Sequence, residues 1–268
     1  MLIAVGDWDD AYANGAHIPD GDRWPDAWIE PARRYRDAAK ARLDVPYGES
    51  ERERLDLFLP EGEPHGLVVF VHGGYWVRLD KSYWSHLAAG AVVRGWAVAM
   101  PSYTLAPHVR VAEITQEIAR AVNHAAGLVD GPIRLAGHSA GGHLVSRMGC
   151  TDVDLACADR IRRIVSVSGL HDLRPLLRVA MNDEIGLDAA ECATESPALL
   201  QPRKGTELVC FVGATERAEF VRQNDLLANV WRGLGAATSA HHEPDRHHFD
   251  VIDGLIDPRS RLIEALLS

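Results

Sequence analysis

Residues 133 to 142 read IRLAGHSAGG, and this stretch decides the fold. It places the pattern G-x-S-x-G between a short apolar run and a segment compatible with a helix. The glycines permit a strand-to-helix turn so sharp that side chains at their positions would clash, and such a turn exposes the serine hydroxyl. We therefore predict that Ser139 is a nucleophile held between a buried strand and the N-terminus of a helix.

The chain around this stretch alternates short apolar runs with longer helix-compatible segments from about Leu55 onward. This alternation is typical of a mostly parallel sheet with helices on both faces. Leu55–Leu59 alternates like a strand with one exposed face, and Ala237–His241 is predicted to close the other edge. The predicted core strands are Val68–Val71, Ala97–Met100, Ile133–Ala136, Ile164–Val167 and Leu208–Val212, and the predicted helices are Lys81–Arg94, Val111–Gly127, Gly141–Cys150 and Ala218–Leu234.

The composition favours a soluble enzyme that acts on a small-molecule substrate. The 268 residues fit one α/β domain over residues 1–268, and no apolar run approaches the roughly 20 residues that span a bilayer. The net charge of −10, with basic residues scattered, argues against nucleic acid as a partner. Neither a secretory leader nor a C-x-x-C pair is evident, so we expect a cytoplasmic protein with reduced cysteines. A homo-oligomer stays open.

The first 45 residues form an N-terminal arm with a different composition, in which aromatic residues are set among Gly, Pro, Asn and Asp. Trp8, Trp24 and Trp28 are examples. Two interpretations remain open at this point: a helical arm packed on the domain, or an aromatic arm that helps to cover the active site.

An oxyanion hole is predicted in His72-Gly73-Gly74-Tyr75-Trp76, directly after the strand at residues 68–71. Glycines let backbone N–H groups approach the oxyanion of a tetrahedral intermediate, and each such donor is worth about 3 kcal/mol. We assign Gly73 and Gly74 as donors, with the N–H of Ala140 as the third.

The general base and the acid of a triad should follow the serine in chain order. His248 is preferred as the base because it lies in the loop after the last predicted strand, and His247 is the alternative. Glu216 is the first carboxylate after the strand at residues 208–212. The second and third choices for the acid are Glu219 and Asp172.

Aromatic residues near these motifs are candidates to line a substrate pocket, namely Tyr75, Trp76, Trp84 and Tyr103. No cofactor or metal is predicted. The rival hypotheses are a metal-dependent hydrolase that uses the histidines of residues 241–248, and a non-catalytic binding module on a hydrolase scaffold.

The sequence resembles the α/β-hydrolase kynurenine formamidases (arylformamidases) and their bacterial esterase relatives. The segments that carry the resemblance, besides the serine motif, are His72–Trp76, Ser168–Leu173, Glu219–Gln223 and His248–Asp250. The resemblance implies the α/β-hydrolase fold and a triad of Ser139, Glu216 and His248. It also implies an ester or aryl formamide substrate, with a small acyl group and an aromatic leaving group. One departure is that the eukaryotic enzymes have aspartate at the position of Glu216.

Overall fold

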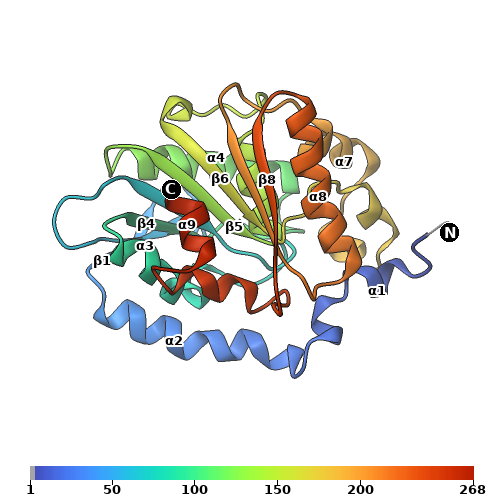
Figure 1. Ribbon diagram of the computed structural model, residues 1–268, viewed down its shortest axis with the longest axis horizontal. Coiled ribbons are helices and arrows are strands. Elements are labelled where there is room, and N and C mark those ends of the chain that lie inside the picture. The colour runs from blue at the N-terminus through green and yellow to red at the C-terminus, as the bar shows by residue number, and fades with distance from the viewer. Residues whose placement is uncertain (1–3) are drawn as a thin grey trace.

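The computed structural model describes residues 4–268 and is built on an eight-stranded sheet (Figure 1). The strands lie in the order β1-β2-β4-β3-β5-β6-β7-β8. β2 is antiparallel to both of its neighbours, β1 and β4, and all other neighbours are parallel. Their bounds are β1 Ala41–Pro46, β2 Arg54–Phe58, β3 Leu67–Val71, β4 Ala97–Pro101, β5 Ile133–His138, β6 Ile161–Val167, β7 Glu207–Gly213 and β8 Ala237–Glu243. The predicted α/β architecture is confirmed.

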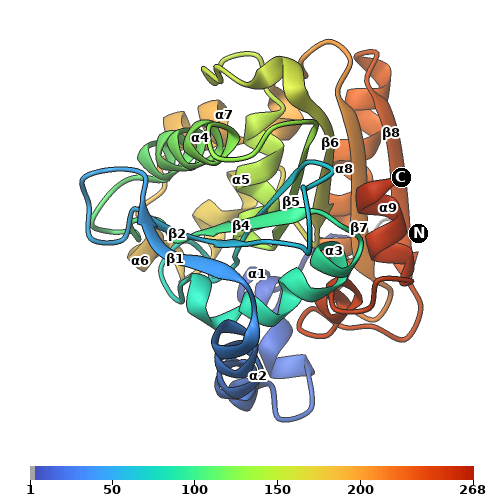
Figure 2. The same ribbon diagram turned by 90° about the vertical axis from the view of Figure 1, so that its left-hand side faces the viewer.

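Helices cover both faces of this sheet, as Figure 2 shows from the side. One apolar core lies between the sheet and α4, α5, α7 and α8, and a second lies between the sheet and α2, α3 and α9. The bounds are α1 Trp8–Tyr12, α2 Trp24–Ala38, α3 Ala89–Val93, α4 Val111–Ala126, α5 Ala140–Met148, α6 Asn182–Ile185, α7 Ala189–Glu195, α8 Ala218–Gly233 and α9 Arg261–Leu267. Among residues 4–268, no helix has the length and apolar character needed to cross a membrane.

The central strands are apolar on both sides because both faces are covered. Every residue of β3 is buried, and its side chains alternate between the two cores, with Val69 in the first and Val68 in the second. The parallel register of β3 with β5 sets Val71 opposite Gly137. The loop after β3 and the turn after β5 therefore emerge at the same end of the sheet.

Two predicted elements differ from the structure. β2 was expected to expose one face, but Asp56 in its middle is fully buried, because Lys81 approaches it to 3.1 Å and Arg36 of α2 pairs with it. The predicted helix Lys81–Arg94 is two short 3₁₀ turns followed by α3. It is interrupted at Trp84, whose φ of −120° and ψ of 0° lie outside the helical region while its indole packs 4.3 Å from that of Trp28.

The N-terminal arm runs along one end of the sheet, where Figure 1 draws α1 and α2 in blue. It ends in β1, an edge strand that was not predicted from the sequence. α2 packs against the 3₁₀ turns at residues 81–88. The arm therefore joins the sheet at β1 and reaches across to the end of the sheet that carries the turn after β5.

Candidate active site

Ser139 occupies a strained turn between β5 and α5. Its φ of 55° and ψ of −117° are unfavourable for a residue with a side chain, and such strain is characteristic of functional positions. The first turn of α5 packs directly on the end of β3. It can do so because residue 141 is glycine: a Cβ there would lie 2.0 Å from the carbonyl oxygen of Val71. Ser139 lines a cavity although only 3% of its surface is exposed.

His248 and Glu216 meet beside this turn. The His248 Nδ1 lies 2.7 Å from the Glu216 Oε2, and both residues are buried. Because a carboxylate can only accept, Nδ1 carries the proton in this pair and Nε2 is left as an acceptor. Ser139 and His248 line the same cavity.

The second carboxylate oxygen of Glu216 is held by two donors. The N–H of Gly213 lies 2.8 Å from Oε1, and the hydroxyl of Ser168 lies 2.5 Å from it. These contacts use the ends of β7 and β6, so the carboxylate is fixed by the sheet itself. The two alternative acids lie elsewhere: Glu219 pairs with Arg222, and Asp172 pairs with Arg174.

The neighbouring histidines have other partners. The Nδ1 of His247 accepts from the N–H of Phe249 at 3.2 Å, and its ring contacts Trp24 with centroids 5.0 Å apart. On β8, His241 bonds to Ser239. His242 bonds to Asp225. Within the described part of the chain, no group of three or more His, Cys, Asp or Glu side chains is arranged to hold a metal ion.

The loop after β3 approaches the serine closely. A Cβ at Gly73 would lie 2.9 Å from the carbonyl oxygen of His138 and 3.1 Å from the Ser139 Cβ, so a side chain there would force the backbone to shift. The next three residues all have positive φ: Gly74 at 115°, Tyr75 at 52° and Trp76 at 62°. The N–H groups of Gly73 and Gly74 donate to no acceptor in residues 4–268, and Ala140 begins α5, where N–H groups have no intrahelical partner. Three unpaired donors thus lie on the two segments that adjoin Ser139.

Burial keeps the other imidazoles of the site neutral. The His138 Nε2 lies 2.8 Å from the carbonyl oxygen of His248, and burial lowers the pKa of His138 well below its usual value. A neutral ring can contact a carbonyl only by donating, so His138 donates and holds the backbone at His248. Burial also lowers the pKa of His72 to about 4.

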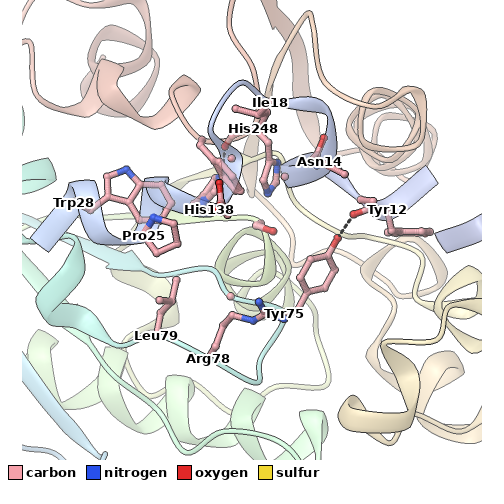
Figure 3. A pocket seen from close by; sticks show the side chains of 18 of the residues that line it. Tyr12, Asn14, Ile18, Pro25, Trp28, Tyr75, Arg78, Leu79, His138 and His248 are labelled. Atoms are coloured by element: carbon pink, nitrogen blue, oxygen red, sulfur yellow. Dashed lines mark hydrogen bonds between the residues drawn. The ribbon is translucent and has the colours of Figure 1, made fainter. Parts of the chain in front are cut away.

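The cavity at Ser139 has a volume of about 810 Å³ and two walls (Figure 3). One wall comes from the loop after β3, the serine turn and the loop after β8. The other comes from the N-terminal arm, including Tyr12, Asn14, Ile18 and Trp28. The arm is fastened by polar contacts as well: the Tyr75 hydroxyl donates to the carbonyl oxygen of Tyr12 at 2.7 Å.

The predicted substrate-binding aromatics fall into two groups. Tyr75 and Trp84 line the cavity. Trp76 and Tyr103 do not; both are fully buried in the core, Trp76 against the ring of His143 and Tyr103 stacked on His72 at 4.3 Å. The structure thus places these two rings in the core and not in the cavity lining, where the prediction had put them.

Several residues that line the cavity were not predicted from the sequence. Ile18, Arg78, Leu79, Met181 and Phe249 all line the cavity. They come from separate segments, and no motif or periodicity singles them out. Only Phe249 could have been found from the sequence, because it is adjacent to His248.

The chain is similar to known proteins in sequence. A family model described as BD-FAE matches residues 55–192. Kynurenine formamidase of Danio rerio is 30% identical over 249 residues, 87% of this chain and 83% of the relative. That of Salmo salar is 29% identical over 257 residues, 89% of this chain and 85% of the relative.

Solved structures share the architecture. A Silicibacter protein provisionally described as a thioesterase is 49% identical, with a TM-score of 0.93 over 98% of this chain and 99% of that one. A Pyrobaculum calidifontis esterase, 16% identical, has a TM-score of 0.70 over 91% of this chain and 88% of its own and shows the fold alone.

Proposed function

This chain belongs to the kynurenine formamidase-like family of α/β hydrolases and is a hydrolase of the ester or formamide type, and from this premise we propose that it works through an acyl-enzyme on Ser139. The observation that carries the proposal is the 2.7 Å contact of His248 Nδ1 with Glu216 at the cavity that Ser139 lines. That contact orients Nε2 as a free base for a hydroxyl in the cavity.

In the proposed mechanism, the Ser139 Oγ attacks the substrate carbonyl carbon while the His248 Nε2 takes the hydroxyl proton. Glu216 stabilises the imidazolium that forms. The oxyanion is bound by N–H groups of Gly73, Gly74 and Ala140, which are unpaired and preorganised. The tetrahedral intermediate collapses, the leaving group departs with the proton from Nε2, and a water deprotonated by the same nitrogen then releases the acid and frees Ser139. No cofactor takes part in this scheme.

The substrate proposed is an ester or formamide with a small acyl group and an aromatic leaving group. The aromatic rings of Trp28, Tyr75, Trp84 and Phe249 line the cavity and support an aromatic leaving group. The arm supplies part of this lining, so we propose that it also covers the site. The name of the formamidase relatives points to an aryl formamide, and the description of the Silicibacter relative points to a sulfur ester.

The test is a comparison of kcat/KM for N-formylkynurenine, phenyl acetate and phenyl thioacetate, in wild type and Ser139→Ala. We expect turnover of at least one by wild type and a loss of about 10⁶-fold in Ser139→Ala. A folded Ser139→Ala protein with near-normal turnover refutes the nucleophile. Esters of one phenol with acetyl, butyryl and octanoyl groups test the acyl size, because a rate that rises to octanoyl contradicts a small acyl group.

A further inference from the structure

The cavity at Ser139 has one Lys or Arg in its lining as described over residues 4–268, and this is Arg78 on the loop after β3. Its backbone N–H donates to the Gly74 carbonyl oxygen at 3.1 Å. Its guanidinium, in contrast, meets no hydrogen-bond acceptor and no carboxylate within that part of the chain. A cation on the open surface needs no partner because water solvates it. Arg78 is exposed as well, but it lines a cavity in which a bound substrate would take the place of that water.

Three other arginines near the site are paired with carboxylates. Arg217 pairs with Asp10, and Arg222 pairs with Glu219 at 2.6 Å. Arg174 pairs with Asp172 at 2.9 Å. In a chain with a net charge of −10, the guanidinium of Arg78 has no such carboxylate partner among residues 4–268.

Arg78 is also held at a fixed place relative to the oxyanion glycines. The N–H groups of Val77 and Arg78 both donate to the Gly74 carbonyl oxygen, at 3.0 and 3.1 Å, which closes a tight turn. The turn is fastened on its far side because Arg52 donates to the Leu79 carbonyl oxygen at 2.6 Å. Figure 3 shows Arg78 between Tyr75 and Leu79, across the cavity from Ile18.

We propose that Arg78 binds a carboxylate on the leaving group of the substrate, an inference that rests on the proposed function. The planar guanidinium matches a carboxylate with two parallel hydrogen bonds. The acyl carbon must lie at the buried Ser139, whereas Arg78 is exposed, so a small acyl group cannot reach it. Asp20 and Asp22 on the arm wall disfavour further negative charge, which limits the ligand to a single carboxylate.

The first experiment compares 4-acetoxybenzoate with its methyl ester, two acetyl esters that differ in the charge of the leaving group. We expect wild type to prefer the carboxylate in kcat/KM by about 10- to 100-fold, the range for one charge-assisted contact. The preference should fall to about one in Arg78→Gln and be kept in part in Arg78→Lys. Arg42→Gln removes the same charge from exposed β1 and should keep the full preference. Absence of a preference in wild type, or an equal loss for both esters in Arg78→Gln, overturns the proposal.

Equilibrium binding of the same two esters to Ser139→Ala protein separates this proposal from the chemistry. Tighter binding of the carboxylate that Arg78→Gln abolishes supports Arg78 even if wild type hydrolyses neither ester, a result that would count against the proposed reaction alone. Equal binding of both esters rejects the carboxylate site even if both are hydrolysed.

Discussion

The end of the sheet and the N-terminal arm both line the cavity, but they are held in place by different interactions. At the end of the sheet, the parallel register of β3, β5, β6 and β7 brings the loops after these strands together. The positions of Ser139 after β5 and Glu216 after β7 are therefore set by the backbone. Ahead of β1, the arm is fastened near the cavity by individual side chains. The Tyr12 hydroxyl donates to Glu219 at 2.9 Å, and Asp10 pairs with Arg217.

This difference suggests a division of roles: the end of the sheet carries the proposed reacting groups, and the arm positions their surroundings. The arm touches none of the three proposed catalytic residues through a hydrogen bond in the described part of the chain, yet it braces their surroundings. The N–H of Arg217, next to Glu216, donates to Asn14 at 3.2 Å. Phe220 packs on both Tyr12 and His248, with ring centroids 5.9 and 4.7 Å apart. Changes at the end of the sheet should abolish turnover, and changes in the arm should only weaken it.

The largest effect is expected at His248. His248→Ala should lower kcat by about 10⁴- to 10⁶-fold because the serine hydroxyl loses its base. His247→Ala should cost far less, because its ring contacts Trp24 and its Nδ1 accepts from the backbone. Steady-state kinetics of both folded variants decide the matter. An inactive His247→Ala beside an active His248→Ala would show that the wrong neighbour had been chosen.

The next effect is on stability and arises in the sheet region, where neutral imidazoles are buried. Burial lowers the pKa of His72 and His171 to about 4 and that of His143 to about 3. A histidine whose folded pKa is lowered contributes stability that is present above its unfolded pKa of about 6.5 and is lost as the pH falls toward the folded value. Urea unfolding at pH 7.5 and 5.5 should therefore differ by about 1 kcal/mol for each group. A free energy of unfolding that is the same at both pH values would contradict the burial of neutral rings.

The smallest effect is expected where the arm meets the loop after β3. Tyr75→Phe removes the hydroxyl that donates to Tyr12, a contact worth about 1 kcal/mol. We expect kcat to fall by about 5-fold because the loop with positive φ at Tyr75 and Trp76 loses a restraint. Tyr83→Phe, outside the cavity lining, is the matched control and should behave like wild type. If Tyr75→Phe also retains full kcat, the arm does not brace the loop.

The sequence was informative where a local pattern demands a particular backbone geometry. The sharp turn at Ser139 could be predicted because G-x-S-x-G between a strand and a helix requires it, and the structure has this turn between β5 and α5. Glu216 followed from its place after a core strand. His248 was preferred to His247 from the sequence, but adjacent residues share a loop, and it is the folded backbone that turns the His248 ring to Glu216.

The features that were not predicted depend on tertiary contacts, which leave no pattern in the sequence. Aromatic residues near a sheet fit the core as well as a cavity, so Trp76 and Tyr103 could not be told from Tyr75. β1 and the break at Trp84 depend on packing between distant segments. The unpaired state of Arg78 is a property of its surroundings, which no periodicity records.

The central proposal is that Ser139 is the nucleophile, and covalent labelling tests it most directly. Wild-type protein should react with a fluorophosphonate to give a single adduct, which peptide mass mapping places on Ser139. Ser139→Ala should remain unlabelled while its thermal unfolding matches that of wild type. An adduct on another residue, or an enzyme that is inert to the reagent but loses activity to a chelator, would contradict the account.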